Sequence, residues 1–219
     1  MKFEDQRKYM VDTQIAGRGI TDPELLKAFS KVPRHLFVPE EYRSFAYKDH
    51  PLGIGKGQTI SQPYIVALSL DLLTLTKNDK VLDIGTGSGY QTALLAEIVA
   101  EVFTIERIPE LLMKARTVLK ELNYTNIHYH LGDGTKGWEK AFPPCKEFDK
   151  IVVSAAAPSI PKSLLAQLAD EGKLVIPAGN RSFQELILVK KRENKLIEKS
   201  FGGCAFVPLI GEEGWKDDD

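Results

Sequence analysis

The stretch that decides the fold is Val81-Leu82-Asp83-Ile84-Gly85-Thr86-Gly87-Ser88-Gly89-Tyr90. Residues 80–84 form a short apolar run that predicts a strand, residues 85–89 predict a turn, and a helical pattern begins at Tyr90. A glycine-rich turn between a strand and a helix lets the backbone approach a ligand and points free N–H groups at it. The spacing departs from the G-x-G-x-x-G of dinucleotide sites at the third glycine, and it lacks the lysine of a phosphate-binding P-loop. The stretch therefore predicts a ligand-binding turn of another type.

Apolar strands alternate with helical patterns downstream of this turn. We expect further strands at residues 102–106, 127–131, 148–154 and 173–177, with helices at 90–99, 109–122 and 161–169. Helices between consecutive strands give right-handed βαβ units and a parallel sheet. Residues 184–190 and 195–200 predict a hairpin, so antiparallel strands should close one edge. The predicted fold is α/β and Rossmann-like, with a mostly parallel sheet and an antiparallel edge.

The first 60 residues predict a helical N-terminal elaboration and a loop. Thr21-Asp22-Pro23-Glu24 has the form of a capping box, and the helix it opens should stop before Pro33. The glycine-rich residues 47–60 predict the loop, and Ser61-Gln62-Pro63 opens a helix through Leu73. Since no linker divides the chain, we expect a single domain over 1–219, with 1–60 as the elaboration and 61–219 as the core. Residues 212–219 predict a solvated tail.

Composition excludes several classes of protein. The 219 residues include 29 Lys+Arg and 30 Asp+Glu, and a net charge of −1 argues against bulk attraction to nucleic acid or an anionic membrane. Cys145 and Cys204 have no ligand spacing, which predicts reduced thiols of a cytosolic protein and no metal site. The charged N-terminus is unlike a signal peptide, and no run approaches the ~20 apolar residues of a membrane span. We therefore expect a cytoplasmic protein.

Three acidic residues give the glycine turn a chemical context. The acidic-x-G-x-G-x-G form of residues 83–89 resembles motif I of S-adenosylmethionine-dependent methyltransferases, in which Asp83 would favour the ligand's ammonium directly or through water. Glu106 ends the second strand, where a carboxylate can accept both ribose hydroxyls. Asp133 follows the third strand, where it can accept from the adenine amine. Asp before Gly is also ordinary turn chemistry, so Asp133 alone has an equally good interpretation as a solvated turn. Three acids at successive strand ends favour a cofactor site.

Further motifs resemble the protein-L-isoaspartate (D-aspartate) O-methyltransferase family, from about residue 8 to residue 215. The signature stretch is Gly57-Gln58-Thr59-Ile60-Ser61-Gln62-Pro63-Tyr64. The other matching stretches are Val32-Pro33-Arg34-His35, Phe37-Val38-Pro39, Gly172-Lys173-Leu174-Val175-Ile176-Pro177 and Phe206-Val207-Pro208-Leu209-Ile210-Gly211. The chain departs from the family at Gly53, where Pro is usual, and at Tyr64, where some members have His.

The resemblance implies a protein-repair enzyme. It would transfer the methyl group of S-adenosyl-L-methionine to the free α-carboxylate of L-isoaspartyl (and D-aspartyl) residues, leaving S-adenosyl-L-homocysteine. The ester would collapse to a succinimide, and hydrolysis would return part of it to normal Asp. Isoaspartyl-containing proteins and peptides would be the partners of a monomeric enzyme. An α-carboxyl has a pKa of about 3.5, so the nucleophile is already anionic and needs no general base. The four histidines accordingly form no recognisable catalytic constellation.

The resemblance also assigns site residues. Ser61 would be catalytic, donating a hydrogen bond that positions the carboxylate, although it could instead be the N-cap of the following helix, or both. The predicted cofactor-binding residues are Thr59, Ile60, Asp83, Gly85, Thr86, Gly87, Ser88, Gly89, Glu106, Asp133 and Gly134. The predicted substrate-binding residues are Ser61, Tyr64, Val207, Pro208 and Leu209.

Three other classes share parts of this pattern. An NAD-dependent oxidoreductase would share the strand, turn and helix, but the glycine spacing disfavours it. A methyltransferase of nucleic acid or of another small molecule would share the cofactor site. An enzyme acting on base amines usually has an Asn/Asp-Pro-Pro-aromatic motif after the fourth strand, where this chain has Ser154-Ala155-Ala156-Ala157-Pro158. A non-enzymatic binding module would not require three acids at successive strand ends.

Overall fold

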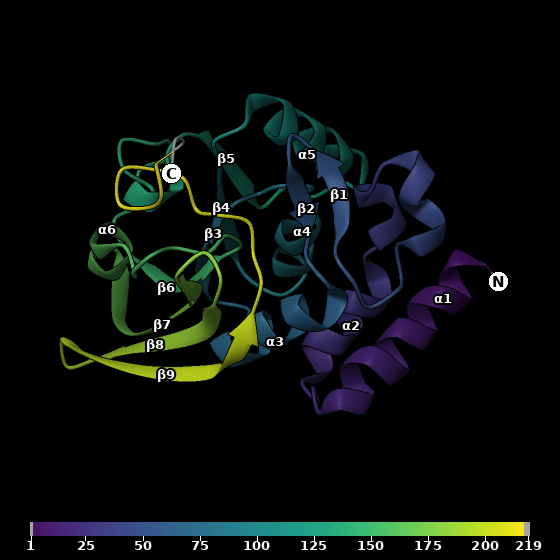
Figure 1. Ribbon diagram of the computed structural model, residues 1–219, viewed down its shortest axis with the longest axis horizontal. Helices are drawn as coiled ribbons and strands as arrows, with labels where there is room; N and C mark the ends of the chain where they lie inside the picture. The colour runs from purple at the N-terminus through teal and green to yellow at the C-terminus, as the bar shows by residue number, and fades with distance from the viewer. Residues whose placement is uncertain (1, 217–219) are drawn as a thin grey trace.

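The computed structural model describes residues 2–216, and these residues form an α/β fold around one large sheet (Figure 1). The strand order of this sheet is β5-β4-β3-β6-β7-β8-β9. Its strands are β3 (Lys80–Ile84), β4 (Glu101–Glu106), β5 (Ile127–Leu131), β6 (Phe148–Val153), β7 (Leu168–Gly179), β8 (Gln184–Arg192) and β9 (Lys195–Cys204). Strands β3 to β7 pair in parallel, whereas β8 and β9 pair antiparallel at one edge. The predicted mostly parallel sheet with an antiparallel edge is confirmed.

The α-helices of the described residues are α1 (Phe3–Tyr9), α2 (Pro23–Lys31), α3 (Pro63–Leu73), α4 (Tyr90–Ala96), α5 (Pro109–Glu121) and α6 (Lys162–Ala166). Helices α3 to α6 pack against the sheet, whereas α1 and α2 pack mainly against other helices. Alternate strand residues face opposite sides, so Val81 belongs to the apolar core that includes Phe29 of α2, while Leu82 belongs to the one that includes Leu164 of α6. Side chains on both faces are buried, as the apolar character of the parallel strands requires. None of the helices within residues 2–216 has the length and apolar character needed to span a bilayer.

The strand order of the sheet changes direction between β3 and β6, although the two strands are parallel. From β3 the chain continues to β4 on one side, whereas β6 pairs with β3 on the other. The residues that follow these two strands are therefore neighbours: the Ser154 N–H donates to the Ile84 carbonyl at 2.8 Å, and a Cβ added at Gly85 would lie 3.5 Å from the Ser154 Cβ. Open α/β sheets bind their ligands at such a reversal.

The N-terminal region is helical, as predicted, but two local predictions are wrong. Helix α2 is capped by Asp22, whose carboxylate accepts the Leu25 N–H at 2.8 Å, and not by a capping box at Thr21. Pro23 occupies the first helical position, so the residue just before it becomes the cap. The predicted loop at 47–60 contains a hairpin of β1 (Leu52–Gly55) and β2 (Gln58–Ile60). The apolar side chains of these strands are buried, which favours pairing over an irregular loop.

The predicted tail is wrong for residues 212–216, while 217–219 lie outside the described residues. We call residues 207–216 the C-terminal strap; Figure 1 shows this yellow segment crossing in front of the sheet, from β9 toward β5. The Glu212 N–H donates to Asp133 Oδ2 at 2.7 Å, and the Trp215 indole donates to the Ala156 carbonyl at 3.0 Å. Hydrogen bonds to residues far away in sequence therefore hold the strap against the core.

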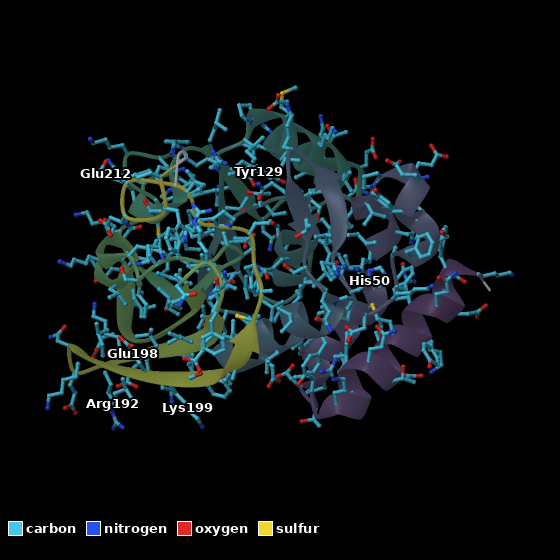
Figure 2. The ribbon with its side chains drawn as sticks, in the orientation of Figure 1. His50, Tyr129, Arg192, Glu198, Lys199 and Glu212 are labelled. Carbon is cyan, nitrogen blue, oxygen red and sulfur yellow. The ribbon has the colours of Figure 1, made fainter. Side chains whose placement is uncertain are left out.

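The opposite edge of the sheet has a different character. Strand β9 is exposed over most of its length, and Arg192, Glu198 and Lys199 project from the β8–β9 hairpin into solvent (Figure 2). Charged side chains on an edge strand oppose pairing with another chain. The structure thus places its polar, exposed edge away from β5, while the carboxyl ends of the parallel strands lie under the strap.

Candidate active site

A cavity opens where the carboxyl ends of β3, β4 and β6 meet the strap. We call it the strand-end cavity, and it lies at the strand ends where open α/β sheets bind their ligands. Of the predicted cofactor residues, those that line it are Thr59, Ile60, Gly85, Thr86, Gly87, Ser88, Glu106 and Gly134. Three strap residues with a predicted substrate role also line it: Val207, Pro208 and Leu209.

The glycine turn forms the floor of the strand-end cavity. Gly85, Gly87 and Gly89 have φ angles of +92°, +53° and +89°, a region that glycine enters without the steric cost that other residues incur. Gly89 does not line the cavity. A Cβ there would lie 3.1 Å from Leu119 and 3.2 Å from Ala115, so this glycine lets α4 and the turn pack closely against α5. The turn therefore combines two tasks, an open floor and a tight helix contact.

Glu106 lies at the end of β4, facing the turn. Its Oε2 accepts the Gly87 N–H at 2.8 Å and its Oε1 accepts the Ile108 N–H at 3.0 Å, and the residue is 6% exposed. A carboxylate has about four acceptor positions, so two remain for hydroxyl donors in the cavity. The ribose contact of Glu106 stays a prediction, and the structure shows another task, because the same carboxylate holds the glycine turn in place.

Asp83 lies behind the cavity wall rather than in it. Its carboxylate is completely buried and accepts hydrogen bonds from Gln91 at 2.8 Å, Thr92 at 2.7 Å and Thr104 at 3.1 Å. Burial raises the pKa of this carboxyl to about 6. Gln91, which the sequence did not single out, lines the cavity in its place. The structure thus gives Asp83 no direct contact with the cavity, and Gln91 links it to the cavity wall.

Asp133 faces the strap and is not part of the cavity wall. Its Oδ1 accepts the backbone N–H and the hydroxyl of Thr135 at 2.9 and 2.7 Å, while Oδ2 accepts the Glu212 N–H. The turn chemistry expected of Asp133 is present, because its carboxylate caps the turn at Thr135, but the residue is not simply solvated, since Oδ2 also anchors the strap. Its neighbour Gly134 is buried in the wall, where a Cβ would lie 2.6 Å from Ile84. Contact between Asp133 and an adenine stays a prediction.

A second cavity adjoins the first, and we call it the side cavity. It is lined by Pro51, Thr59, Ser61, Gln62, Ile65, Ser154, Gly203, Cys204, Ala205, Phe206 and Val207. Four residues line both cavities, and we call them the shared rim: Thr59, Ser61, Ser154 and Val207. Most of the side cavity away from the rim is apolar. The geometry therefore provides two adjoining spaces, with hydroxyl groups where they meet.

Ser61 occupies the shared rim without being a helix cap. The N-cap of α3 is Gln62, so the alternative interpretation of Ser61 as N-cap is wrong. Its carbonyl instead accepts a hydrogen bond from Arg34 Nη2 at 2.8 Å. Arg34 is completely buried and also donates to the Ala46 carbonyl at 2.7 Å. Burial lowers the pKa of Arg34 to about 10, which leaves it charged at pH 7. Sequence reasoning gave Arg34 no role, although the motif Val32-Pro33-Arg34-His35 contained it.

The remaining candidates lie away from both cavities. The Arg18 guanidinium lies 3.3 Å from the centre of the Tyr64 ring, and the backbone N–H of Tyr64 donates to Asp49 at 3.1 Å. Tyr64 lines neither cavity, so its placement does not support the predicted substrate contact. The four histidines also line neither cavity. Within residues 2–216, no three His, Cys, Asp or Glu side chains gather as ligands for a metal ion.

The charged groups at the strand-end cavity indicate which kind of cofactor fits it. Glu106 lies in the wall and Asp83 lies one side chain behind it. Arg107 also lines the cavity but is exposed, whereas the two carboxylates are buried, and buried negative charge favours a ligand with an ammonium and a sulfonium group over a pyrophosphate. Carboxylate acceptors at the end of β4 also suit the hydroxyls of a ribose. The fold and this site define a class I S-adenosylmethionine-dependent methyltransferase.

Comparison with known proteins narrows this class. The family model described as protein-L-isoaspartate(D-aspartate) O-methyltransferase matches residues 5–214, and the chain belongs to this family. Relatives named protein-L-isoaspartate O-methyltransferase include one from Trichlorobacter lovleyi, 55% identical over 99% of this chain and 98% of its own. Another, from Petrotoga mobilis, is also 55% identical, over 98% of this chain and 100% of its own.

Solved structures agree with this assignment. A structure titled protein-L-isoaspartate O-methyltransferase has a TM-score of 0.85 and 26% identity, covering 95% of this chain and 67% of its own. A Plasmodium falciparum structure, titled as a putative protein-L-isoaspartate O-methyltransferase in complex with S-adenosyl-L-homocysteine, has a TM-score of 0.81 and 27% identity. It covers 94% of this chain and 98% of its own.

Proposed function

We propose that this chain transfers the methyl group of S-adenosylmethionine to the free α-carboxylate of L-isoaspartyl (and D-aspartyl) residues in damaged proteins. Membership of the family and 55% identity to relatives with this name support the proposal. The observation that carries it is the pair of adjoining cavities with Ser61 on their shared rim. One cavity is suited to the cofactor, the other is open to a polypeptide, and methyl transfer would take place between them.

The strand-end cavity would hold the cofactor by the residues already described. Glu106 accepts from the ribose hydroxyls, and the glycine turn contacts the methionyl part. Gln91, which donates to Asp83, lies between that carboxylate and the cavity. The family's cofactor supplies a methyl group on a positively charged sulfur, and when a carboxylate oxygen bonds to that carbon, the C–S electron pair returns to sulfur. The products are a methyl ester and S-adenosyl-L-homocysteine.

The protein's own task is orientation. The attacking carboxylate is ionised at pH 7, so no residue needs to remove a proton. Ser61 donates a hydrogen bond to the carboxylate from the shared rim, and Arg34 fixes the Ser61 backbone. Holding two reactants in line contributes several kcal/mol, up to roughly 7–11 in favourable cases. The rim residue Val207 borders the same space on the strap side.

The partners are isoaspartyl-containing proteins and peptides. The side cavity, whose wall includes Ile65 and Phe206, accommodates the chain that flanks the modified residue. We further propose a monomer in the cytoplasm without nucleic-acid or membrane partners, supported by the net charge of −1 and by two free thiols. A single domain over residues 1–219 is supported by Phe29 and Val81, which lie in one apolar core.

Incubation with methyl-labelled S-adenosylmethionine tests the proposal. The substrates are an isoaspartyl peptide, the same peptide with normal Asp, and an RNA of mixed sequence. We expect label in the isoaspartyl peptide alone, as an ester that mild base releases. Preferential labelling of the RNA, or of a small molecule added in a further reaction, would favour the alternative that this is a methyltransferase of another substrate.

A further inference from the structure

Ser154 lies beside the carboxyl ends of β3 and β6, where the strand order of the sheet changes direction. It is the first residue after β6, it is half-buried, and it lines both the strand-end cavity and the side cavity. Ser61 also belongs to the shared rim, but it comes from a different part of the chain, the segment before α3. We propose that Ser154 donates a second hydrogen bond to the isoaspartyl carboxylate, from the β6 side of the rim. This inference rests on the proposed function.

The hydrogen bonds around Gln91 determine how the Ser154 hydroxyl points. Gln91 Nε2 donates to Asp83 Oδ1 at 2.8 Å and to Ser154 Oγ at 2.7 Å, which uses both hydrogens of the amide. An ionised Asp83 carboxylate can only accept, so the amide nitrogen, not its oxygen, must face it. Ser154 Oγ is therefore an acceptor toward Gln91, and its own hydrogen points elsewhere.

That hydrogen has no acceptor within the protein. The Ser154 N–H donates to the Ile84 carbonyl, but among residues 2–216 the Ser154 O–H donates no hydrogen bond. A hydroxyl that accepts on one side and has a free proton on the other is ready to donate. Since Ser154 borders both cavities, the anion that reaches the rim is a suitable acceptor.

Two donors on different elements would fix the carboxylate better than one. A single hydrogen bond leaves the carboxylate free to rotate about that bond, whereas a second from β6 restricts its plane. Hydrogen bonds to a charged group are also the stronger kind. Ser61 and Ser154 would then act together, each with its own support: Arg34 behind the first and Gln91 behind the second.

The test measures binding and methyl transfer in three variants. Ser154→Ala removes the donor, Ser154→Thr keeps it, and Ser182→Ala is a matched control because exposed Ser182 lines neither cavity. We expect Ser154→Ala to weaken binding of an isoaspartyl peptide, measured with S-adenosyl-L-homocysteine present, by roughly 10-fold or more. Its single-turnover rate should fall by a similar factor, while S-adenosyl-L-homocysteine affinity changes less than twofold. Ser154→Thr should stay within about threefold of the parent.

Each outcome is decisive. Parent-like peptide binding and rate in Ser154→Ala would overturn the proposal, as would an equal loss of S-adenosyl-L-homocysteine affinity, which marks a structural role through Gln91. If Ser154→Ala does not fold, Ser154→Gly gives the same comparison, since it also removes the hydroxyl. Failure of the proposed function is separate: the parent enzyme itself would then leave the isoaspartyl peptide unlabelled.

Discussion

The strand-end cavity and the side cavity share a rim but are built from different kinds of structure. The first is walled by strand ends, and buried polar groups such as Asp83 and the Thr86–Thr104 hydroxyl pair at 2.7 Å support that wall from behind. The second is walled mainly by connecting segments, including Pro51 and the partly exposed residues 205–206. A constant ligand suits walls fixed by a sheet, and a variable polypeptide suits walls formed by loops. The difference indicates where this enzyme requires rigidity and where it tolerates variety.

The largest effect should come from the shared rim, where the two cavities can be separated. Ser61→Ala removes the proposed donor. The activation free energy of methyl transfer should then rise by about 2–4 kcal/mol, by analogy with other preorganised donors, and the single-turnover rate on an isoaspartyl peptide should fall accordingly. Affinity for S-adenosyl-L-homocysteine, measured by calorimetry, should stay near that of the parent. Ser61→Thr keeps the hydroxyl and serves as control. An alanine variant that methylates at the parent rate, while folded, would remove Ser61 from catalysis.

A second test concerns the buried charge behind the strand-end cavity. Burial raises the Asp83 pKa from 3.8 to about 6, so the folded protein holds a proton there that the unfolded chain has lost. This group therefore makes the free energy of unfolding fall as pH rises from about 4 to 6, by about 3 kcal/mol. An asparagine side chain cannot titrate, so denaturation of Asp83→Asn and of the parent should show stabilities that diverge by this amount across the interval.

The control for this pH effect has the opposite sign. Glu110 is exposed and paired with Lys56 at 2.6 Å, and the Lys56 hydrogen bond lowers its pKa. Comparing Glu110→Gln with the parent should therefore show the parent gaining relative stability as pH rises. Two difference curves of the same sign would contradict the assignment of the pH effect to burial of Asp83.

Glu106→Ala should damage the strand-end cavity alone. Losing charged hydrogen bonds to ribose hydroxyls should cost about 1.5–3 kcal/mol, or roughly 10- to 150-fold in S-adenosylmethionine affinity. Because the carboxylate also accepts the Gly87 and Ile108 N–H groups, the melting midpoint should fall as well. Glu110→Ala, also an acidic residue beside this region, is the matched control. Calorimetric titration with an unchanged dissociation constant would remove Glu106 from the cofactor site.

The smallest effect should come from the side cavity. Phe206→Ala removes an apolar wall, so KM for an isoaspartyl peptide should rise about fivefold, equivalent to about 1 kcal/mol, with kcat and cofactor affinity little changed. Phe183, which is 60% exposed and lines neither cavity, provides the control Phe183→Ala. A loss of cofactor affinity in Phe206→Ala, with peptide KM unchanged, would show that the two cavities are not separate in function.

The same contrast explains what the sequence could predict. Strand β3, the glycine turn and Glu106 follow from short local patterns, and the structure places them as expected. The strap did not, because its hydrogen bonds join residues 78 and 79 positions apart and no local pattern contains them. Arg34 and Gln91 were missed for a similar reason: each acts through a contact, to Ser61 and Asp83, that only the folded chain creates. Hairpin β1–β2 was not predicted because Gly53, Gly55 and Gly57 make its sequence resemble that of a loop.

The strap has a consequence for biosynthesis. It contributes Val207, Pro208, Leu209 and Ile210 to the strand-end cavity, and its anchor at Asp133 joins residues that leave the ribosome 79 positions apart. A nascent chain that has emerged only as far as β9 contains every strand of the large sheet but lacks this wall. The strand-end cavity is therefore completed by residues made after the whole sheet has been translated.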